Sequence, residues 1–479
     1  MSILYSRSGI TTYRENSTSV YGLNEIYTQT TTDRLQYRGS PRLMGMGSHL
    51  LNISHRSSPT LAQAGDFTRG KRANYTSTEH ALFLMDDLNQ LYAYGSNSGG
   101  WLGLQGIAGN RHNNFWSSVE PSGHYYCCGI QTTGTLWTWG YNTFGQLGHN
   151  DTTQRNSPVQ ILGTVWKSVK PFNWTGLTQQ YSPNTFAITQ DNTLYAWGSN
   201  YFGMLGQNET VALNRSTPIQ IPGTWIQIER SGQHAAAIKP EEGTLNVSRG
   251  QLYTWGHNNH GQLGLNDVVP RSSPTSIMGN VKYILPPNDN LNTFVKRQDG
   301  SLWGWGQNDT GQLGQNDVVP RSSPVKIPGS WQDITIKNKC VLCFQQGTGQ
   351  IWGWGRNDHG QLGQYTSANF SNPVQIPGEY DPMFGFSFDG QVAHAVKRIR
   401  SEGEFYGLWG WGDNRFGQLG IGIFNSTRYS PSLVSAGSTF PPVGTVGAAS
   451  TLAFWADLRL TPNISIENTQ QNVYLINRL

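Results

Sequence analysis

Residues 302–314 read LWGWGQNDTGQLG, and this stretch decides the fold because close copies of it recur along the chain. An element of the form L-x-x-W-G occurs seven times, and six of the copies continue as x-N-x-x-G-[QM]-L-G. Successive copies are 45 to 58 residues apart. An internal repeat of this length is typical of solenoids and propellers. The seven elements begin at Leu91, Leu136, Leu194, Leu252, Leu302, Ile351 and Leu408.

Each repeat contains three further strand-like segments. In the fifth copy an apolar run at 294–296 precedes the motif, a P-x-x-apolar segment follows at 324–327, and a W-x-x-apolar segment follows at 331–334. Gly, Asn and Asp turns separate them, and helical periodicity over ten or more residues appears nowhere. Four short strands repeated about every 50 residues predict an all-β fold, a β-propeller of four-stranded blades.

The motif itself suggests how blades pack. The two-residue period of a strand places both aromatic side chains of L-W-G-W-G on one face, where flat rings can fill the gap between blades. The glycines leave the other face open to close approach by a second sheet. The Leu of G-Q-L-G is expected to lie beneath the loop, and the Asn to form an Asx-turn or a left-handed residue.

These residues closely resemble the regulator-of-chromosome-condensation repeat family, whose hallmark is x-W-G-x-N-x-x-G-Q-L-G. The resemblance covers residues 81–434 and implies a seven-bladed β-propeller. The first copy departs from the pattern, because Tyr94 stands in place of Trp and the Gln is missing.

The two ends of the chain suggest how the ring closes. Residues 43–47 read LMGMG, like the motif strand with Met in place of Trp, and residues 451–455 read TLAFW, like the apolar run before a motif. A composite blade built from both ends would leave no sheet edge exposed. We therefore predict seven regular four-stranded repeats, giving seven blades, or eight if the ends form a composite blade. The expected divisions are an N-terminal docking arm at 1–42, the propeller at 43–460 and a C-terminal tail at 461–479.

Composition argues against several classes of function. Charged residues make up 13% of the chain, against about 25% in average soluble proteins, and the net charge is only +4. Dense Lys/Arg runs are absent, so no nucleic-acid partner is expected, and no continuous apolar run predicts membrane insertion. The four cysteines lie in apolar runs and are interpreted as buried thiols. No recognisable acid–base pair or metal motif is present, so we expect no enzymatic activity, no metal and no cofactor.

The loop of each motif supplies candidate binding residues. Scaffold positions are constant between copies, whereas the two residues before the second Gly vary. Repeat folds commonly bind through the face that carries variable side chains, and exposed Phe residues there would be anchors. The alternative is that these Phe side chains pack under neighbouring loops. The candidate loop residues are Thr143, Phe144, Tyr201, Phe202, Asn259, His260, Asp309, Thr310, Asp358, His359, Arg415 and Phe416.

A second candidate set consists of arginines that precede the P-x-x-apolar segments. The more specific hypothesis is an anion-binding ring, because Arg suits bidentate contacts with phosphate or carboxylate. The alternative is that each Arg caps carbonyl groups of an adjacent blade. The candidate residues are Arg155, Arg215, Arg271, Arg321 and Arg428.

Two functions compete. The chain looks like the structural or adhesion proteins of tailed bacteriophage that carry these repeats, and its low charge and Asn/Thr/Ser/Gly richness favour that interpretation. It predicts a multicopy virion protein whose arm and tail dock onto other virion proteins and whose loops contact a host surface glycan or protein. The alternative is a cytoplasmic or nuclear interaction propeller of the same family, such as a small-GTPase exchange factor or a scaffold.

Overall fold

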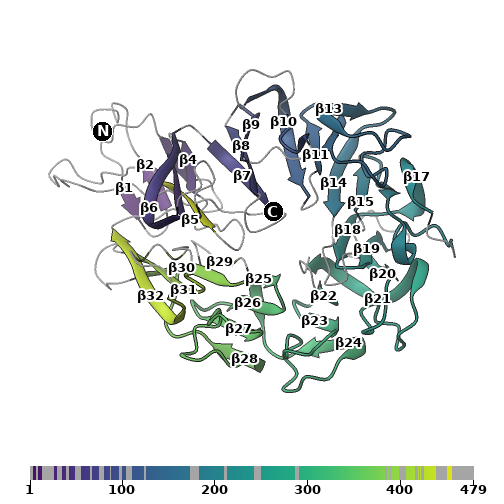
Figure 1. Cartoon of the computed structure of the whole chain (residues 1–479). Helices are drawn as coiled ribbons and strands as arrows, with labels where there is room; N and C mark the ends of the chain where they lie inside the picture. Colours follow the sequence, from purple (N-terminus) through teal and green to yellow (C-terminus); the bar gives the residue numbers. More distant parts are fainter. Residues whose placement is uncertain are drawn as a thin grey trace.

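The computed structural model arranges the chain as a ring of antiparallel sheets (Figure 1). In each sheet the strands step outward from the centre of the ring (Figure 1). The structure describes strands within 4–74, the strand at 450–455, and most of 80–437. The gaps in that central part are 87, 96–99, 104–110, 123–125, 173–182, 210–212, 242–249, 286–290, 383–385, 389, 399–405, 416–418, 420 and 422–425.

Seven four-stranded units follow one another around the ring, and each begins with its innermost strand. Two long strands, β10 and β21, end one unit and begin the next. Unit 1 is β7 (Phe67–Asn74), β8 (His80–Asp86), β9 (Gln90–Gly95) and β10 (Arg111–Pro121). Unit 2 is β10, β11 (Tyr126–Gln131), β12 (Leu136–Gly140) and β13 (Arg155–Ile161). Unit 3 is β14 (Trp166–Phe172), β15 (Asn184–Thr189), β16 (Thr193–Gly198) and β17 (Arg215–Thr224).

The remaining units repeat this order. Unit 4 is β18 (Gln227–Ser231), β19 (His234–Pro240), β20 (Gly250–Gly256) and β21 (Arg271–Leu285). Unit 5 is β21, β22 (Asn292–Arg297), β23 (Leu302–Gly306) and β24 (Arg321–Ile327). Unit 6 is β25 (Trp331–Lys337), β26 (Cys340–Gln345), β27 (Ile351–Gly355) and β28 (Phe370–Gln375). Unit 7 is β29 (Phe386–Phe388), β30 (Val392–Arg398), β31 (Tyr406–Gly412) and β32 (Arg428–Gly437).

The two ends of the chain meet in a composite sheet. Strand β33 (Ser450–Trp455) pairs with β5 (Arg42–Ser48), and β5 pairs with β6 (His55–Ala64). Figure 1 shows the yellow C-terminal strand beside the purple N-terminal ones. The predicted composite unit is therefore confirmed, and it stands beside the seven four-stranded units. Within the predicted arm lie two hairpins, β1 (Leu4–Ser6) with β2 (Gly9–Thr12) and β3 (Ile26–Gln29) with β4 (Leu35–Arg38). The residues of the predicted tail at 461–479 lie outside the described part of the chain.

The motif strand packs as its two-residue period predicts. Trp225, on the short link before β18, contacts both aromatic rings of β20, Tyr253 and Trp255, at centroid distances of 5.6 and 6.0 Å. Both rings therefore lie on one face of the sheet. The second aromatic of the motif is fully buried in units 2 to 7, and so is the Leu of the following loop. The four cysteines are buried and form no disulfide, as expected. Within the described residues no helix is long and apolar enough to cross a membrane.

Units 2 to 7 are each hydrogen-bonded to the preceding unit through the buried tryptophan. The indole Nε1 of Trp305 in unit 5 donates to the main-chain oxygen of Gln262 in unit 4, at 3.0 Å. The same bond recurs from unit 1 to unit 7 with N···O distances of 2.8 to 3.0 Å. Unit 1 follows the pattern despite its divergent sequence, because the carbonyl of Trp101 accepts from Trp139. The tryptophan thus fixes the position of one loop relative to the next.

Candidate functional site

The loop after each motif strand is held by its own Asn and Gln side chains. In unit 4 the Oδ1 atom of Asn258 accepts from the N–H of Leu263 at 2.9 Å, and its Nδ2 atom donates to the carbonyl of Val269 at 3.0 Å. The Oε1 atom of Gln262 accepts from the N–H of His260 at 2.8 Å. Asn258 and Gln262 are buried and satisfied by the loop backbone. The scaffold residues therefore face inward.

The variable residues accordingly form the tips of the loops. Thr143, Asn259, Asp309, Asp358 and Arg415 are exposed. The other described candidates are half-buried: Phe144, Tyr201, Phe202, His260, Thr310 and His359. Phe416 lies outside the described residues. We call the set of loop tips in units 2 to 7 the loop face.

Phe202 packs against its neighbours instead of standing clear of the surface. Its ring lies 4.3 Å from Tyr201 in its own loop and 4.3 Å from His257 in the loop of unit 4. At this position the structure favours the alternative that the Phe packs against a neighbouring loop. Phe202 is therefore better described as a contact between units 3 and 4 than as an anchor for a ligand.

Charged side chains of units 6 and 7 form one network across the loop face. The Asp358 carboxylate accepts from Arg356 at 2.5 Å and contacts Nδ1 of His359 at 2.8 Å. Nε2 of His359 lies 3.3 Å from Arg415 of unit 7, which in turn binds Asp413 at 2.8 Å. The adjacent residues Asp358 and His359 thus meet Arg415, which lies 56 positions beyond His359 in the sequence.

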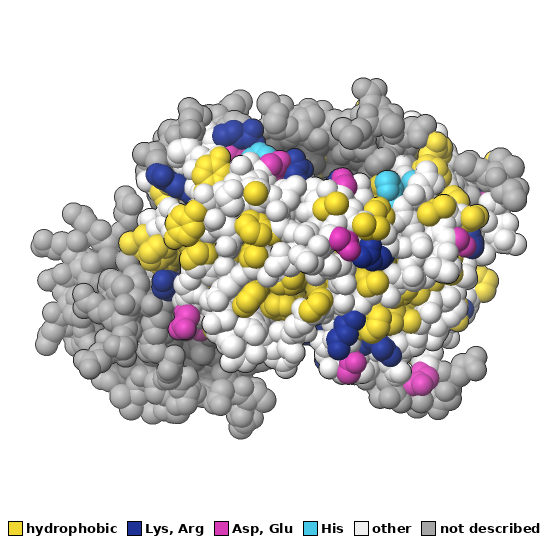
Figure 2. All heavy atoms as spheres, turned by 90° about the horizontal axis from the view of Figure 1, so that it is seen from below, with side chains coloured by type: hydrophobic (Ala, Val, Ile, Leu, Met, Phe, Trp, Pro, Cys, Tyr) yellow, Lys and Arg dark blue, Asp and Glu magenta, His cyan; other side chains and the backbone are white. Residues whose placement is uncertain are grey.

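A second ion pair joins units 5 and 6 on the same face. Lys339, in the turn between β25 and β26, donates to Asp309 at 2.6 Å. His260 of unit 4 lies within electrostatic range of both groups, and burial is the main reason that its pKa is lowered. On the face drawn in Figure 2, acidic and basic side chains of the described residues lie next to one another in small groups. We call the ion pairs and hydrogen bonds of Asp309, Lys339, Arg356, Asp358, His359, Asp413 and Arg415 the loop network.

Two groups of the loop network, Asp358 and Arg415, have pKa values shifted in the direction that preserves their charge. Burial alone would raise the pKa of Asp358, but hydrogen bonds from His359, Arg356 and Gln361 outweigh it and hold that pKa at about 2. Hydrogen bonds to Asp413 raise the pKa of Arg415. A carboxyl whose pKa is depressed keeps its favourable contacts above its unfolded value and loses them only as the pH falls through the depressed one. The Asp358 carboxylate is therefore ionised at neutral pH.

Four of the five arginines in the candidate anion ring already have carboxylate partners. Arg155, Arg271 and Arg321 each bind the Asp four residues earlier, at 2.5 to 2.6 Å, and Arg215 binds Glu209. The same three arginines also donate to a carbonyl group two residues earlier, so they brace their own loop and not an adjacent blade. Guanidinium groups committed in this way have little capacity for an external anion. Arg428 occupies the equivalent position at the start of β32.

Sequence reasoning missed three members of the loop network. Arg356 and Asp413 precede the Asn of their loops. This position differs among the six regular copies, so the same internal comparison could have found them. Lys339 comes from an irregular turn with no motif around it, and no sequence signal identifies it. Among the described residues no group of three or more His, Cys, Asp and Glu side chains could hold a metal ion.

Comparison with known families identifies the repeat. The model of the regulator of chromosome condensation (RCC1) repeat matches six segments, which together cover just over half of the chain. The chain belongs to this family. The matched residues are 133–170, 191–238, 249–285, 299–337, 348–387 and 407–453. The divergent first copy lies before the first matched segment, although its residues form a regular unit in the structure.

Curated relatives match only part of this RCC1-repeat chain. The Protein RCC2 homolog of Danio rerio is 36% identical over 138 residues, which cover 29% of this chain and 25% of the relative. The probable E3 ubiquitin-protein ligase HERC4 of Rattus norvegicus is 28% identical over 214 residues, which cover 42% of this chain and 19% of the relative. The chain thus spans about a fifth to a quarter of the length of these relatives.

Solved structures confirm the propeller fold. Yeast RCC1 (Prp20), solved bound to Kap60, superposes with a TM-score of 0.54 at 16% identity, covering 96% of this chain and 95% of that one. Human WBSCR16 gives a TM-score of 0.52 at 16% identity, covering 87% and 98%. These likenesses establish the fold. None of these four relatives is a protein of a virus particle, so the virion interpretation gains no support.

Proposed function

We propose that this RCC1-repeat propeller is a cellular protein-interaction module that binds a protein partner through the loop face of units 4 to 7. The observation that carries this proposal is the loop network, in which Asp358, His359 and Arg415 join two units. Its charged groups are already ordered, so a partner would not have to immobilise them on binding. Mixed charges of this kind favour partner selection and orientation over raw affinity.

The relatives supply the class of partner to test. One solved neighbour is yeast RCC1 (Prp20) bound to Kap60, and another is Prp20p, described with its binding properties to Gsp1p and histones. Protein partners are thus a property of the neighbours, which supports the same class of ligand for this chain. Small-GTPase exchange is the alternative function. It is supported by solved neighbours that have the same fold and bind protein partners. The arm at 1–42 and the tail at 461–479 remain candidate docking segments.

Charge reversal at Arg415 tests this proposal. Arg415 is exposed and its guanidinium joins both units of the network, so R415E replaces an attraction by a repulsion beside Asp413 and Asp358. Binding of purified Kap60, Gsp1p and histones would be measured by calorimetry. We expect one of them to bind, and R415E to weaken that binding at least about tenfold, which corresponds to about 1.4 kcal/mol.

A matched control separates the loop face from general electrostatics. Lys326 is exposed on β24, at the outer edge of unit 5, so K326E makes the same change of charge away from the loop tips. This variant should bind within about twofold of the parent chain. Equal weakening by both variants, or no binding by any of the three proteins, would contradict the proposal. Acceleration of GDP release from a small GTPase would favour the exchange-factor alternative over a scaffold.

A further inference from the structure

Exposed apolar side chains occupy one position in three successive units. The position lies two residues before the outer strand of the unit, where the chain leaves the loop. Leu213 occupies it in unit 3 and is 51% exposed, and Val269 and Val319 occupy it in units 4 and 5. Val268 and Val318, one residue earlier, and the two valines that follow them are each 55 to 56% exposed. The corresponding residue is Thr in unit 2 and Ser in unit 7.

The turns that carry the valines are held by their own backbone. Units 4 and 5 share the sequence NDVVPRSSP, at 266–274 and 316–324. In unit 4 the N–H of Val269 donates to the carboxylate two residues earlier at 3.0 Å. The carbonyl of the same residue accepts from Asn258 at 3.0 Å and from Arg271 at 2.6 Å. The three bonds recur in unit 5 at 3.0, 3.1 and 2.7 Å, so both turns are fixed while their valine side chains are left at the surface.

Tyr365 of unit 6 adds a further exposed side chain beside these turns, in a backbone conformation that opposes a bulky residue. Its φ is +63° and it is 71% exposed. Asn enters this left-handed region far more readily than Tyr. A bulky residue kept there with its side chain in solvent points to a contact outside the chain. The equivalent residues of units 2 to 5, all with φ between +57° and +63°, are Asn150, Asn208, Asn266 and Asn316.

The exposed apolar side chains are arranged symmetrically about the boundary between units 4 and 5. On either side of it comes a pair of valines and then one larger side chain, Leu213 in unit 3 or Tyr365 in unit 6. The charges beside the valines are already paired, because Arg271 and Arg321 bind the Asp four residues earlier at 2.6 and 2.5 Å. A two-fold axis through this boundary would set valines against valines and Leu against Tyr, with each neighbouring charge balanced.

We propose that this surface, which we call the apolar rim, is the contact of a homodimer in which unit 4 of one copy faces unit 5 of the other. A contiguous apolar patch on the surface of a folded chain marks an interaction site. A second copy of the chain fits the patch, because a two-fold contact uses one surface twice and this surface is complementary to itself. The apolar rim consists of Leu213, Val268, Val269, Val318, Val319 and Tyr365.

Sedimentation velocity of the full chain, from about 1 to about 200 µM, measures this association. The contact is small, so we expect a monomer–dimer equilibrium with a dissociation constant on the order of 10 µM. V318D should weaken it at least about tenfold, because each substitution occurs twice in the dimer. Y365N should also weaken it, and should at the same time stabilise the folded chain against denaturant, because Asn suits the left-handed conformation.

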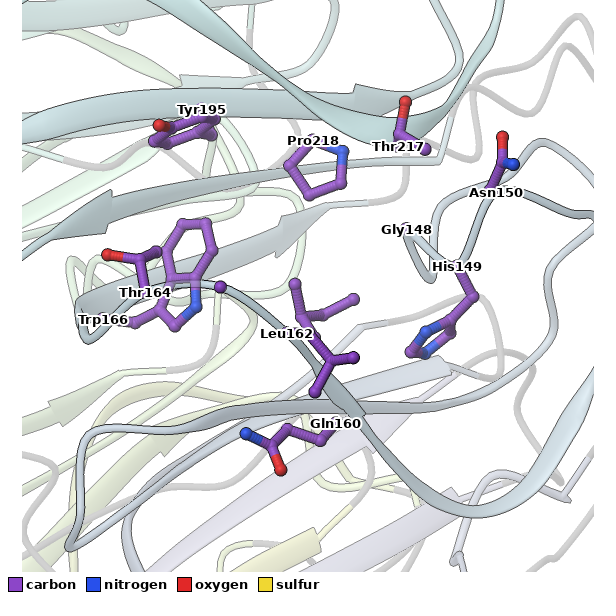
Figure 3. Close-up of a pocket in the computed structure, with 12 residues that line it drawn as sticks. Gly148, His149, Asn150, Gln160, Leu162, Thr164, Trp166, Tyr195, Thr217 and Pro218 are labelled. Atoms are coloured by element: carbon purple, nitrogen blue, oxygen red, sulfur yellow. The ribbon is translucent and has the colours of Figure 1, made fainter.

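Leu162 provides the matched control, because it is an exposed apolar residue outside the apolar rim. It is 81% exposed and lines a pocket of about 470 Å³ between units 2 and 3 (Figure 3). L162D places a new carboxylate at the surface, as V318D does. This variant should leave the dissociation constant of the dimer within about twofold of the parent value.

Cross-linking tests the two-fold arrangement itself. The four native cysteines are buried, so a short bis-maleimide should react at introduced thiols. An equimolar mixture of V268C and V318C chains should give a covalent dimer, whereas neither variant alone should, because the axis sets unit 4 against unit 5.

Three results would overturn the proposal: a chain that stays monomeric over this range, a dimer that V318D and Y365N leave unchanged, or cross-linking of V268C to itself in place of the mixture. Loss of a different protein's binding through V318D, without any self-association, would assign the apolar rim to that protein and would equally overturn the homodimer. No residue of the apolar rim belongs to the loop network, so a monomeric chain would leave the proposed function of the loop face standing.

Discussion

Acidification from pH 7 to pH 5 is expected to lower the free energy of unfolding of the propeller by about 7 kcal/mol, because four histidines are buried in neutral form. His112, His234 and His394 are each at most 1% exposed, and His257 is 6% exposed. Burial lowers the pKa of His112, His257 and His394 to about 4 and that of His234 to about 3. Each ring therefore stays neutral in the folded chain over this range of pH.

The sign follows from proton uptake by the unfolded chain. Unfolded histidine has a pKa near 6.5, so below that pH the unfolded state gains protons that the folded state does not. The contribution of each buried histidine to the free energy of unfolding is fully present above about pH 6.5. Below that pH it falls by roughly 1.4 kcal/mol per pH unit until the pKa of the folded state is reached. A loss of about 7 kcal/mol is comparable to the whole stability of many domains.

Denaturant unfolding at pH 7 and pH 5, followed by tryptophan fluorescence, measures this effect. H394Q removes one titrating group from the core and should flatten the pH dependence by about a quarter. H359Q, at the surface of the loop network, is the matched control substitution and should change the pH dependence by less than H394Q does. A stability that is the same at both pH values would contradict the burial of these four rings as neutral groups.

The second large effect is expected at Gly311, where the loop of unit 5 touches unit 6. Its φ is +80°, and an added Cβ would lie 2.4 Å from the Cα atom of Ser371 on β28. Alanine there must adopt a left-handed conformation and also separate two backbones. We expect G311A to lower the free energy of unfolding by about 2–4 kcal/mol.

Gly347 supplies the matched control for that substitution. Its φ is +78°, and an added Cβ would meet nothing within 4 Å. G347A therefore carries only the conformational cost, about 1 kcal/mol. The difference between the two variants, measured by chemical denaturation, reports the contact between units. Equal losses would show that the loop of unit 5 is not packed against β28 as described.

Much of the fold was predictable because the repeat encodes it locally. The two-residue period of residues 302–306 correctly placed both aromatics on one face, and the Leu of the loop correctly fell beneath it. The resemblance of 451–455 to a repeat strand correctly indicated a composite closing unit. The first two features depend on neighbours within a single repeat, and the third depends on a unit divided between the two ends of the chain. In each case the residues involved keep a recognisable form of the repeat pattern.

The candidate site was predictable only in part. Comparison of the repeats with one another identified Asp309, Asp358, His359 and Arg415 as variable loop residues. It did not predict the ion pair of Asp309 with Lys339, which lies in a turn outside the motif. In the arginine set, a carboxylate precedes Arg155, Arg271 and Arg321 by four residues, and this spacing could have indicated their partners. Low charge and Asn/Ser/Thr richness favoured a virion protein, but composition describes a surface and does not identify its partner.

Site-specific photo-crosslinking inside cells of the source organism tests the central claim most directly. A photoreactive amino acid would replace Asn259, an exposed tip of the loop face, or Leu433, which is 47% exposed on the outer strand β32. The account predicts one defined protein adduct from position 259 that R415E diminishes, and no matching adduct from position 433. The same adduct from both positions, or adducts only from the outer strand, would contradict a partner bound at the loop face.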